Sequence, residues 1–181
     1  GYYPEFHDKI RVIPQGFKFD DIQKSNEPLP TDKVIFGYGG MFIPGRRDPS
    51  EFLTYLNSID ASVQFEFHVY TTTPHLVEPF VAASHGRIQL KPIVDRTTLL
   101  AEMSKMHFVV NFENVGSTQT PSKLIDFAIL EKPILSLKFG AFNPQVVDEF
   151  FAGNYQNALV IENVDQYRIE NVAKAFLALL P

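Results

Sequence analysis

The sequence predicts an α/β fold in which one parallel β-sheet carries helices on both faces. Two observations predict it. From Lys33 onward, short runs of β-branched and aromatic residues alternate with amphipathic stretches, and this alternation is typical of parallel βαβ units. The chain also has 181 residues, 45% hydrophobic and 20% charged, which is enough for one globular domain with a full core. We therefore expect a Rossmann-like, doubly wound open sheet.

The first strand and helix carry clear signals. Residues 34–38, reading Val-Ile-Phe-Gly-Tyr, predict a buried strand that ends in a pair of glycines. Asp48 is a suitable N-cap, and Pro49 suits the first helical position. Because an apolar face follows, we expect a helix over residues 49–59.

The second and third units follow the same pattern. Strands are expected at residues 65–70 and 87–90, with a helix over residues 74–83 between them. Asp95 is expected to cap a third helix. The buried face of that helix is expected to consist of Leu99, Leu100 and Met103.

The remaining elements complete the alternation. Residues 108–112 are strongly apolar, as an inner parallel strand should be. A fourth helix is expected over residues 121–131, and it leads into a fifth strand at residues 133–137. The last expected elements are a helix at residues 144–151, a short strand at 158–161 and a helix at 165–180.

The first part of the chain stands outside this alternation. Residues 1–32 are rich in Pro, Asp and Lys, with one strand-like piece at residues 10–14. We expect residues 1–32 to form an inter-domain linker and strand, and residues 33–181 to form the Rossmann-like domain. Gly1 is not an initiator Met, so we expect the chain to be part of a longer protein.

Composition excludes several kinds of function. A net charge of −5 argues against a large binding surface for nucleic acid. The absence of cysteine removes disulfides, thiol catalysis and Cys-ligated zinc, and the five histidines lack metal-binding spacing, so no metal is expected. No apolar run approaches the roughly 20 residues of a membrane span, and no signal segment opens the chain. We expect a cytoplasmic protein.

The loop after the first strand is a candidate phosphate site. Gly39 and Gly40 let the backbone come close to a ligand, and Arg46 and Arg47 can add charge-assisted hydrogen bonds. The alternative is a tight turn with two solvated arginines. The loop is not a G-x-G-x-x-G fingerprint, which argues against a standard dinucleotide site.

A second candidate lies at the start of the fourth helix. The polar segment at residues 116–120 leads into a helix with Pro121 in its first turn, which is a ready anion site. Lys123 adds positive charge there, and Asp126, one turn later, can accept hydrogen bonds from vicinal hydroxyls. The alternative is a capped helix with a Lys–Asp pair worth only ~0.3 kcal/mol.

These features resemble a known family. The segment Pro-Ser-Lys-Leu-Ile-Asp-Phe at residues 121–127 is followed by Lys-Pro-Ile at residues 132–134, and residues 10–17 look like an inter-domain strand. In these stretches, and in the loop from Gly-Gly to Arg, the chain resembles the C-terminal domains of GT-B glycosyltransferases, especially those of bacterial polysaccharide and capsule assembly. The resemblance covers roughly residues 8–175.

The resemblance implies how a nucleoside-diphosphate sugar is held. Asp126 would accept the ribose hydroxyls, and the backbone of Pro92, Ile93 and Val94 would receive the base. The diphosphate would be bound by Gly39, Gly40, Arg46, Arg47 and Lys123. The candidates near the sugar are Glu113, Asn114, Thr118 and Gln119, of which Thr118 stands where many retaining members carry an acidic residue.

The expected function is therefore that of a donor domain, in which the nucleotide sugar is a substrate and no cofactor is needed. The acceptor and the catalytic residues would belong to a missing N-terminal domain, so this part is expected to be inactive alone. Any membrane association would come from that missing half. Two alternatives stay open: a non-catalytic, flavodoxin-like nucleotide-binding or regulatory module, and a GT-B-like sugar-nucleotide epimerase.

Overall fold

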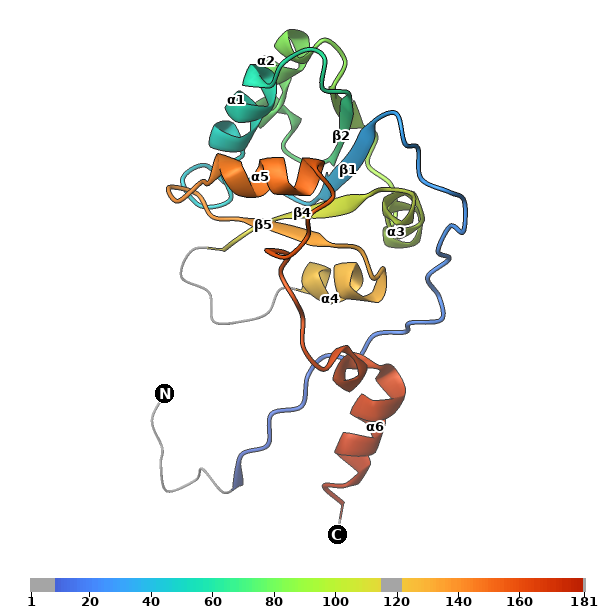
Figure 1. The fold of residues 1–181 in the computed structure, drawn as a ribbon. Helices are drawn as coiled ribbons and strands as arrows, with labels where there is room; N and C mark the ends of the chain where they lie inside the picture. Colours follow the sequence, from blue (N-terminus) through green and yellow to red (C-terminus); the bar gives the residue numbers. More distant parts are fainter. Residues whose placement is uncertain (1–8, 115–121, 181) are drawn as a thin grey trace. The chain divides into compact units, whose positions relative to one another are not determined.

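The fold was described from a computed structural model, which covers residues 9–114 and 122–180 (Figure 1). Its sheet contains β1 (Val34–Gly39), β2 (Phe65–Tyr70), β3 (Ile88–Lys91), β4 (Phe108–Phe112) and β5 (Ile134–Leu137). These strands lie in the order β3-β2-β1-β4-β5, and every pair is parallel. The predicted Rossmann-like α/β fold is confirmed. The chain runs outward from β1 to β3 and then returns to β4, so the strand order reverses between β1 and β4.

Helices cover both faces of the sheet. Figure 1 shows α3 and α4 on one face, and α1, α2 and α5 on the other. None of the described helices combines the length and the hydropathy of a bilayer-spanning segment. The helices are α1 (Ser50–Ser58), α2 (Glu78–Val81), α3 (Arg96–Ser104), α4 (Ser122–Ile129), α5 (Pro144–Phe151) and α6 (Ile169–Leu177).

Stacked aromatic rings form the core between the sheet and the helices α1 and α5. The Phe36 ring on β1 lies 4.9 Å from that of Phe67 on β2 and 4.7 Å from that of Phe108 on β4. Phe52 of α1 meets Phe36 edge to face at 6.3 Å. Rings at such separations contribute about 0.5–1.5 kcal/mol per pair beyond area burial, so this layer ties the three inner strands to α1.

The opposite face of β1 carries Gly37 and Gly39 after Ile35. A Cβ at Gly37 would lie 2.5 Å from the Met106 sulfur, and one at Gly39 would lie 2.7 Å from Leu99. Real side chains do not approach so closely, so α3 and the residues after it can lie on β1 only because the strand presents no side chain there. The alternation Gly-Tyr-Gly therefore sets the depth at which α3 packs.

The expected helix over residues 74–83 is wrong as a continuous element. The segment consists of η2 (Pro74–Leu76), α2 and η3 (Ala82–Ser84), which are short and of two types. Pro79 explains the break, because it has no N–H to donate four residues back and its ring would collide with the carbonyl of His75.

The expected strand at residues 158–161 is also wrong. Leu159 N–H donates to the Ile134 carbonyl at 2.9 Å, but no strand forms there. Val160 is 76% exposed, so the apolar run does not bury the alternating face that an edge strand needs.

The C-terminal helix begins later than the sequence predicts. Instead of one helix over 165–180, η4 (Val164–Tyr167) is followed by an extended Arg168 and then by α6. Phe17 is the cause: its N–H donates to Tyr167 O at 2.7 Å, and its carbonyl accepts from Ile169 N–H at 3.0 Å. This pairing takes backbone groups that a continuous helix would have used.

The chain divides into two compact units, residues 1–21 with 162–181, and residues 22–161. In the first unit, the strand expected at residues 10–14 does not form. The pairing described there is a bridge between Phe17 and Arg168. The Arg168 guanidinium also lies 4.3 Å from the centre of the Phe19 ring. The second unit holds the whole sheet. The predicted division between residues 32 and 33 stays a prediction.

We expect Gly39→Val to lower the free energy of unfolding by about 1–3 kcal/mol, because the new side chain would overlap Leu99. Urea unfolding of the variant, of Leu99→Ala and of the double variant measures this. If the packing is as described, the double variant is more stable than the sum of the single losses by about 0.5–3 kcal/mol. Strict additivity would contradict the contact.

Candidate functional site

Three side chains from separate segments gather where β1 ends. Tyr38 lies on β1, Arg47 lies in the loop that follows, and Lys123 lies in the first turn of α4. The Lys123 Nζ lies 4.8 Å from the centre of the Tyr38 ring, and the positive charge of Arg47 acts on both neighbours. We call Tyr38, Arg47 and Lys123 the cationic cluster. It lies at the carboxyl end of β1, beside the reversal of strand order, where open α/β sheets bind ligands.

The loop after β1 is held by its own backbone. Gly40 has φ +152°, and its N–H donates to Tyr70 O at 2.9 Å. Phe42 N–H donates to the Thr73 hydroxyl at 3.0 Å, and Gly45 N–H donates to Asp48 at 3.0 Å. The backbone amides of Gly40, Phe42 and Gly45 therefore already have acceptors. The positive charge of the site comes chiefly from side chains.

Gly39 and Gly40 serve the site by packing. Gly39 ends β1 and faces Leu99 of α3, as described above. At Gly40 a Cβ would lie 2.9 Å from the Tyr38 hydroxyl, and its backbone conformation is one that side chains disfavour. Gly40 therefore leaves room for the Tyr38 ring, and Gly39 leaves room for α3.

The two arginines of this loop differ in their surroundings. Arg46 is exposed, as the solvated-turn alternative requires. Arg47 is partly buried, and its Nε is shielded from solvent without a hydrogen-bond partner among the described residues. Such buried donors are uncommon in folded proteins and cost roughly 1–3 kcal/mol. Of the two predicted candidates, Arg47 is thus the one built into the site.

Lys123 also has a shielded donor atom without an acceptor in the described structure. Its Nζ is shielded from solvent and makes no hydrogen bond within the described part of the chain. Burial, with a smaller contribution from nearby Arg47, lowers the pKa of Lys123 to about 7. An ammonium group is expensive to bury without an anion, so this position favours an anionic ligand.

Tyr38 does not neutralise the cluster. Its hydroxyl donates to the Met41 carbonyl at 3.0 Å, and burial raises the pKa of Tyr38 to about 12. The phenol is therefore uncharged at neutral pH. Its ring offers Lys123 a cation–π contact, worth about 0.5–2 kcal/mol, which does not replace hydrogen bonds.

Asp126 is engaged by a residue that the sequence did not single out. The Arg96 Nε donates to both carboxylate oxygens of Asp126 at 3.1 Å, and the second guanidinium nitrogen, Nη2, donates to Oδ1. Arg96 is the first residue of α3, directly after the cap Asp95, which accepts from Thr98 N–H as expected. Its place immediately after the predicted base-binding loop was the one signal that could have marked it.

The loop predicted to receive the base follows β3. Pro92 is exposed, Ile93 is 66% exposed and Val94 is partly buried. The loop runs directly into Arg96, and the pairing of Arg96 with Asp126 links the start of α3 to α4. The loop is therefore connected, through Asp95 and Arg96, to the α4 residue that is predicted to bind the ribose.

The residues predicted to lie near the sugar are only partly described. Glu113 and Asn114 are exposed just beyond β4, whereas Thr118 and Gln119, with Pro121, lie outside the described residues. Glu113 accepts from the Ser136 hydroxyl at 3.1 Å. Ser136 in turn accepts from the amide of Asn111 at 2.9 Å. Asn111 is 2% exposed, and its Oδ1 has no hydrogen-bond partner among the residues described.

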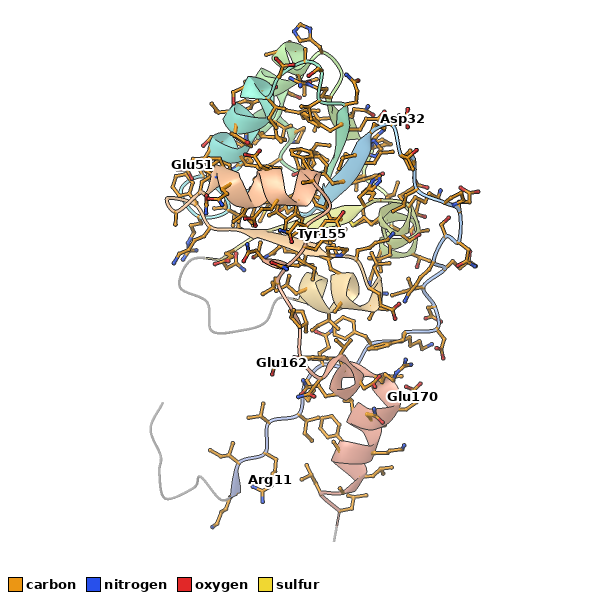
Figure 2. All side chains as sticks on the ribbon, in the orientation of Figure 1. Arg11, Asp32, Glu51, Tyr155, Glu162 and Glu170 are labelled. Atoms are coloured by element: carbon orange, nitrogen blue, oxygen red, sulfur yellow. The ribbon has the colours of Figure 1, made fainter. Side chains whose placement is uncertain are left out.

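A shallow pocket adjoins the loop after β1 at the carboxyl ends of β4 and β5. Its lining includes Asp48, Glu51, Phe112, Leu137 and Lys138. Figure 2 shows Glu51 at the start of α1, beside the loop that follows β5. Gly140 N–H of that loop donates to Glu51 at 3.0 Å, so the rim of the pocket is fixed to α1.

Two histidines, His68 and His107, make structural contacts. Ile35 N–H donates to the His107 Nδ1 at 3.0 Å, and the opposite ring nitrogen, Nε2, lies 3.0 Å from the Pro30 carbonyl. His68 pairs with Glu66 on β2 at 2.9 Å. Across residues 9–114 and 122–180, no three His, Asp or Glu side chains gather in a way that could hold a metal ion.

Comparisons with known proteins address the fold. No protein-family model and no curated protein sequence matches the chain significantly. Among solved structures, AviGT4, a glycosyltransferase involved in avilamycin A biosynthesis, aligns over 95% of this chain with a TM-score of 0.59 and 12% identity. WaaB, a lipopolysaccharide outer core galactosyltransferase, aligns over 96% with a TM-score of 0.59 and 12% identity.

A third match is a variant of TarM from S. aureus, solved with fondaparinux, α-GlcNAc-glycerol and UDP. It aligns over 97% of this chain with a TM-score of 0.57 and 16% identity. The fold is that of one half of a GT-B architecture. The chain spans 58% of AviGT4, 57% of WaaB and 41% of the TarM variant, and identities this low show the fold alone. The resemblance noted from the sequence is thus confirmed at the level of this GT-B half.

We expect Lys123→Met to raise the free energy of unfolding by up to about 4 kcal/mol near pH 6. The lowered pKa of Lys123 reflects the cost of burying its ammonium group, and each pKa unit corresponds to about 1.36 kcal/mol. The folded pKa is about 7 and the unfolded value 10.5, so between these pH values the unfolded chain binds more protons. Stability of the wild type therefore rises with pH across that window, and the advantage of the variant shrinks.

Urea unfolding at pH 6 and at pH 9.5 measures the effect. Lys105→Met, which removes an exposed lysine paired with Glu102, is the control and should show no comparable change with pH. A difference between Lys123→Met and wild type that stays constant over both pH values would contradict the burial of an unpaired ammonium group.

Proposed function

We propose that this chain is the donor-binding half of a glycosyltransferase, which holds a nucleoside-diphosphate sugar while the sugar passes to a glycan or lipid-linked acceptor. The observation that carries the proposal is the cationic cluster. Two shielded donor atoms, Arg47 Nε and Lys123 Nζ, lack hydrogen-bond acceptors among the described residues, at the carboxyl end of the sheet where such folds bind ligands. A diphosphate supplies the missing acceptors and the missing negative charge.

The chemistry of the cluster suits a leaving diphosphate. When the bond between sugar and diphosphate breaks, negative charge grows on the bridging oxygen and spreads over the phosphates. Preorganised donors that already lack water are worth more at that moment than donors that must first lose it. Arg47 would act as a fixed cation, and Lys123 would take up a proton as the anion enters, because its pKa of about 7 would rise beside a negative charge.

The proposed positions for the remaining parts of the donor are those that the sequence resemblance implies. Asp126 lies about one turn along α4 from Lys123 and would accept the ribose hydroxyls. The base would lie over residues 92–94. The sugar would lie toward Glu113 and Asn114, where Asn111 presents an amide oxygen without a partner in the described structure.

The acceptor side belongs to the rest of the proposed enzyme. The chain spans 57–58% of AviGT4 and WaaB, and in the proposal the unmatched portion would hold the acceptor and the groups that activate it. We therefore expect this chain to bind donor without transferring sugar. A role in polysaccharide assembly in the cytoplasm is part of the same proposal.

We expect Arg47→Ala to weaken binding of inorganic pyrophosphate and of nucleoside diphosphates by about 10- to 100-fold, the loss expected for charge-assisted hydrogen bonds. Isothermal titration calorimetry of this chain measures it. Arg46→Ala is the matched control: it removes the same charge from the adjacent, exposed position and should cost less than about threefold. Equal effects of the two substitutions would reduce the site to general surface charge.

We expect Asp126→Asn to weaken the best-binding member of a series of UDP, GDP, ADP, dTDP and CMP by about tenfold, one hydrogen bond to a charged acceptor. Binding of pyrophosphate should not change, because it makes no ribose contact. If Asp126→Asn weakens pyrophosphate as much as nucleotide, Asp126 acts through the structure of α4 rather than on the ribose.

A further inference from the structure

We propose that Arg96 is a positioning residue of the nucleoside site, which holds the Asp126 carboxylate in the orientation that receives a ribose hydroxyl. This inference rests on the function proposed above. It adds a residue from α3 to a site otherwise built from β1, the loop after it and α4. Its basis is the side-on pairing of Arg96 with Asp126.

The contact geometry leaves room for a ligand. Arg96 uses two nitrogens: Nε donates to both oxygens at 3.1 Å, and Nη2 donates to Oδ1. These donors make three contacts with a carboxylate that offers about four lone-pair positions. Acceptor capacity for a further donor remains, chiefly on Oδ2, which accepts only the shared Nε–H, and a ribose hydroxyl can supply that donor.

The exposed fractions of the two side chains differ, and the more buried one is the carboxylate that Arg96 orients. The side chain of Asp126 is 14% exposed, whereas that of Arg96 is 43% exposed. A carboxylate with so little contact with water depends on its partner for hydrogen bonds and for its orientation. Side-on guanidinium pairing restricts rotation of the carboxylate more than a single lysine contact does.

The backbone that carries the Arg96 side chain is held in place by packing. Arg96 opens α3 directly after the cap Asp95, and α3 lies against Gly39 of β1 through Leu99 and Met103. Its side chain therefore extends from a fixed backbone toward α4. Because the loop at residues 92–94 enters the same helix, one element positions both the predicted base loop and the ribose acceptor.

The experiment compares two ligands that differ by one hydroxyl: the ribonucleoside diphosphate that binds best, and its 2′-deoxy counterpart. Calorimetric titration gives the ratio of their dissociation constants for wild type, Arg96→Ala and Arg96→Lys. We expect a ratio of about tenfold in the wild type, which corresponds to one hydrogen bond. It should fall below about threefold in Arg96→Ala and take an intermediate value in Arg96→Lys, which keeps the charge but loses the two-nitrogen grip.

Pyrophosphate is the internal control for folding and for the diphosphate site. Its affinity for Arg96→Ala should stay within about twofold of wild type, which also shows that the variant is folded. Lys105→Ala removes one exposed charge beside the other end of α3 and should leave the ribose ratio unchanged. A merely structural role of Arg96 would lower both affinities together without changing the ratio.

Two results overturn the inference while the proposed function stands: an unchanged ratio in Arg96→Ala, or tighter nucleotide binding in that variant, which would make Arg96 a competitor for Asp126. Pyrophosphate that still binds the wild type in an Arg47-dependent way identifies these cases. If the wild type binds neither pyrophosphate nor any nucleotide of the series at millimolar concentration, the proposed function fails and this inference fails with it.

Discussion

The close approach of α3 to β1 is the constraint on which the site depends. Gly37 and Gly39 leave the carboxyl-terminal part of one face of the central strand without side chains, and Leu99, Met103 and Met106 occupy the space. A helix held at this depth brings its first residue, Arg96, to Asp126 of α4. On the other face, the stacked rings around Phe36 hold β2 and β4 to the same strand. Both layers make β1 the reference from which the surrounding loops are positioned.

The cationic cluster lowers the stability of the fold, because it buries donor atoms that have no acceptor within residues 9–114 and 122–180. Lys123 and Arg47 each have a donor atom that is shielded from solvent and lacks a hydrogen-bond acceptor among the described residues. Such unpaired buried atoms are rare in natural proteins. Tyr38 is neutral and satisfied by Met41, so it supplies shape rather than charge. Perturbed groups of this kind collect at functional sites, and in the proposed function a diphosphate would supply acceptors to both side chains.

The strong local signals correspond to elements that formed as expected. The cap Asp95 and the apolar run at β4 predicted their structures because a capping side chain and a fully buried strand act through neighbouring residues. Expectations failed where one residue competed with the pattern. Pro79 broke the helix predicted over residues 74–83, and Phe17 took the backbone groups of Tyr167 and Ile169 that a longer C-terminal helix needed. A partner more than 140 positions away in the chain leaves no trace in local periodicity.

The sequence by itself determined the α/β class, the parallel sheet and the loops in which a phosphate ligand would be sought, since these follow from alternating periodicity and from glycines after a strand. Only the tertiary structure decided which side chains make the site. It separated partly buried Arg47 from exposed Arg46, engaged the Gly40 amide with Tyr70, and joined Arg96 to Asp126, 30 residues apart in the chain. Burial and pairing depend on the packing of distant segments, which a linear pattern of residue types does not encode.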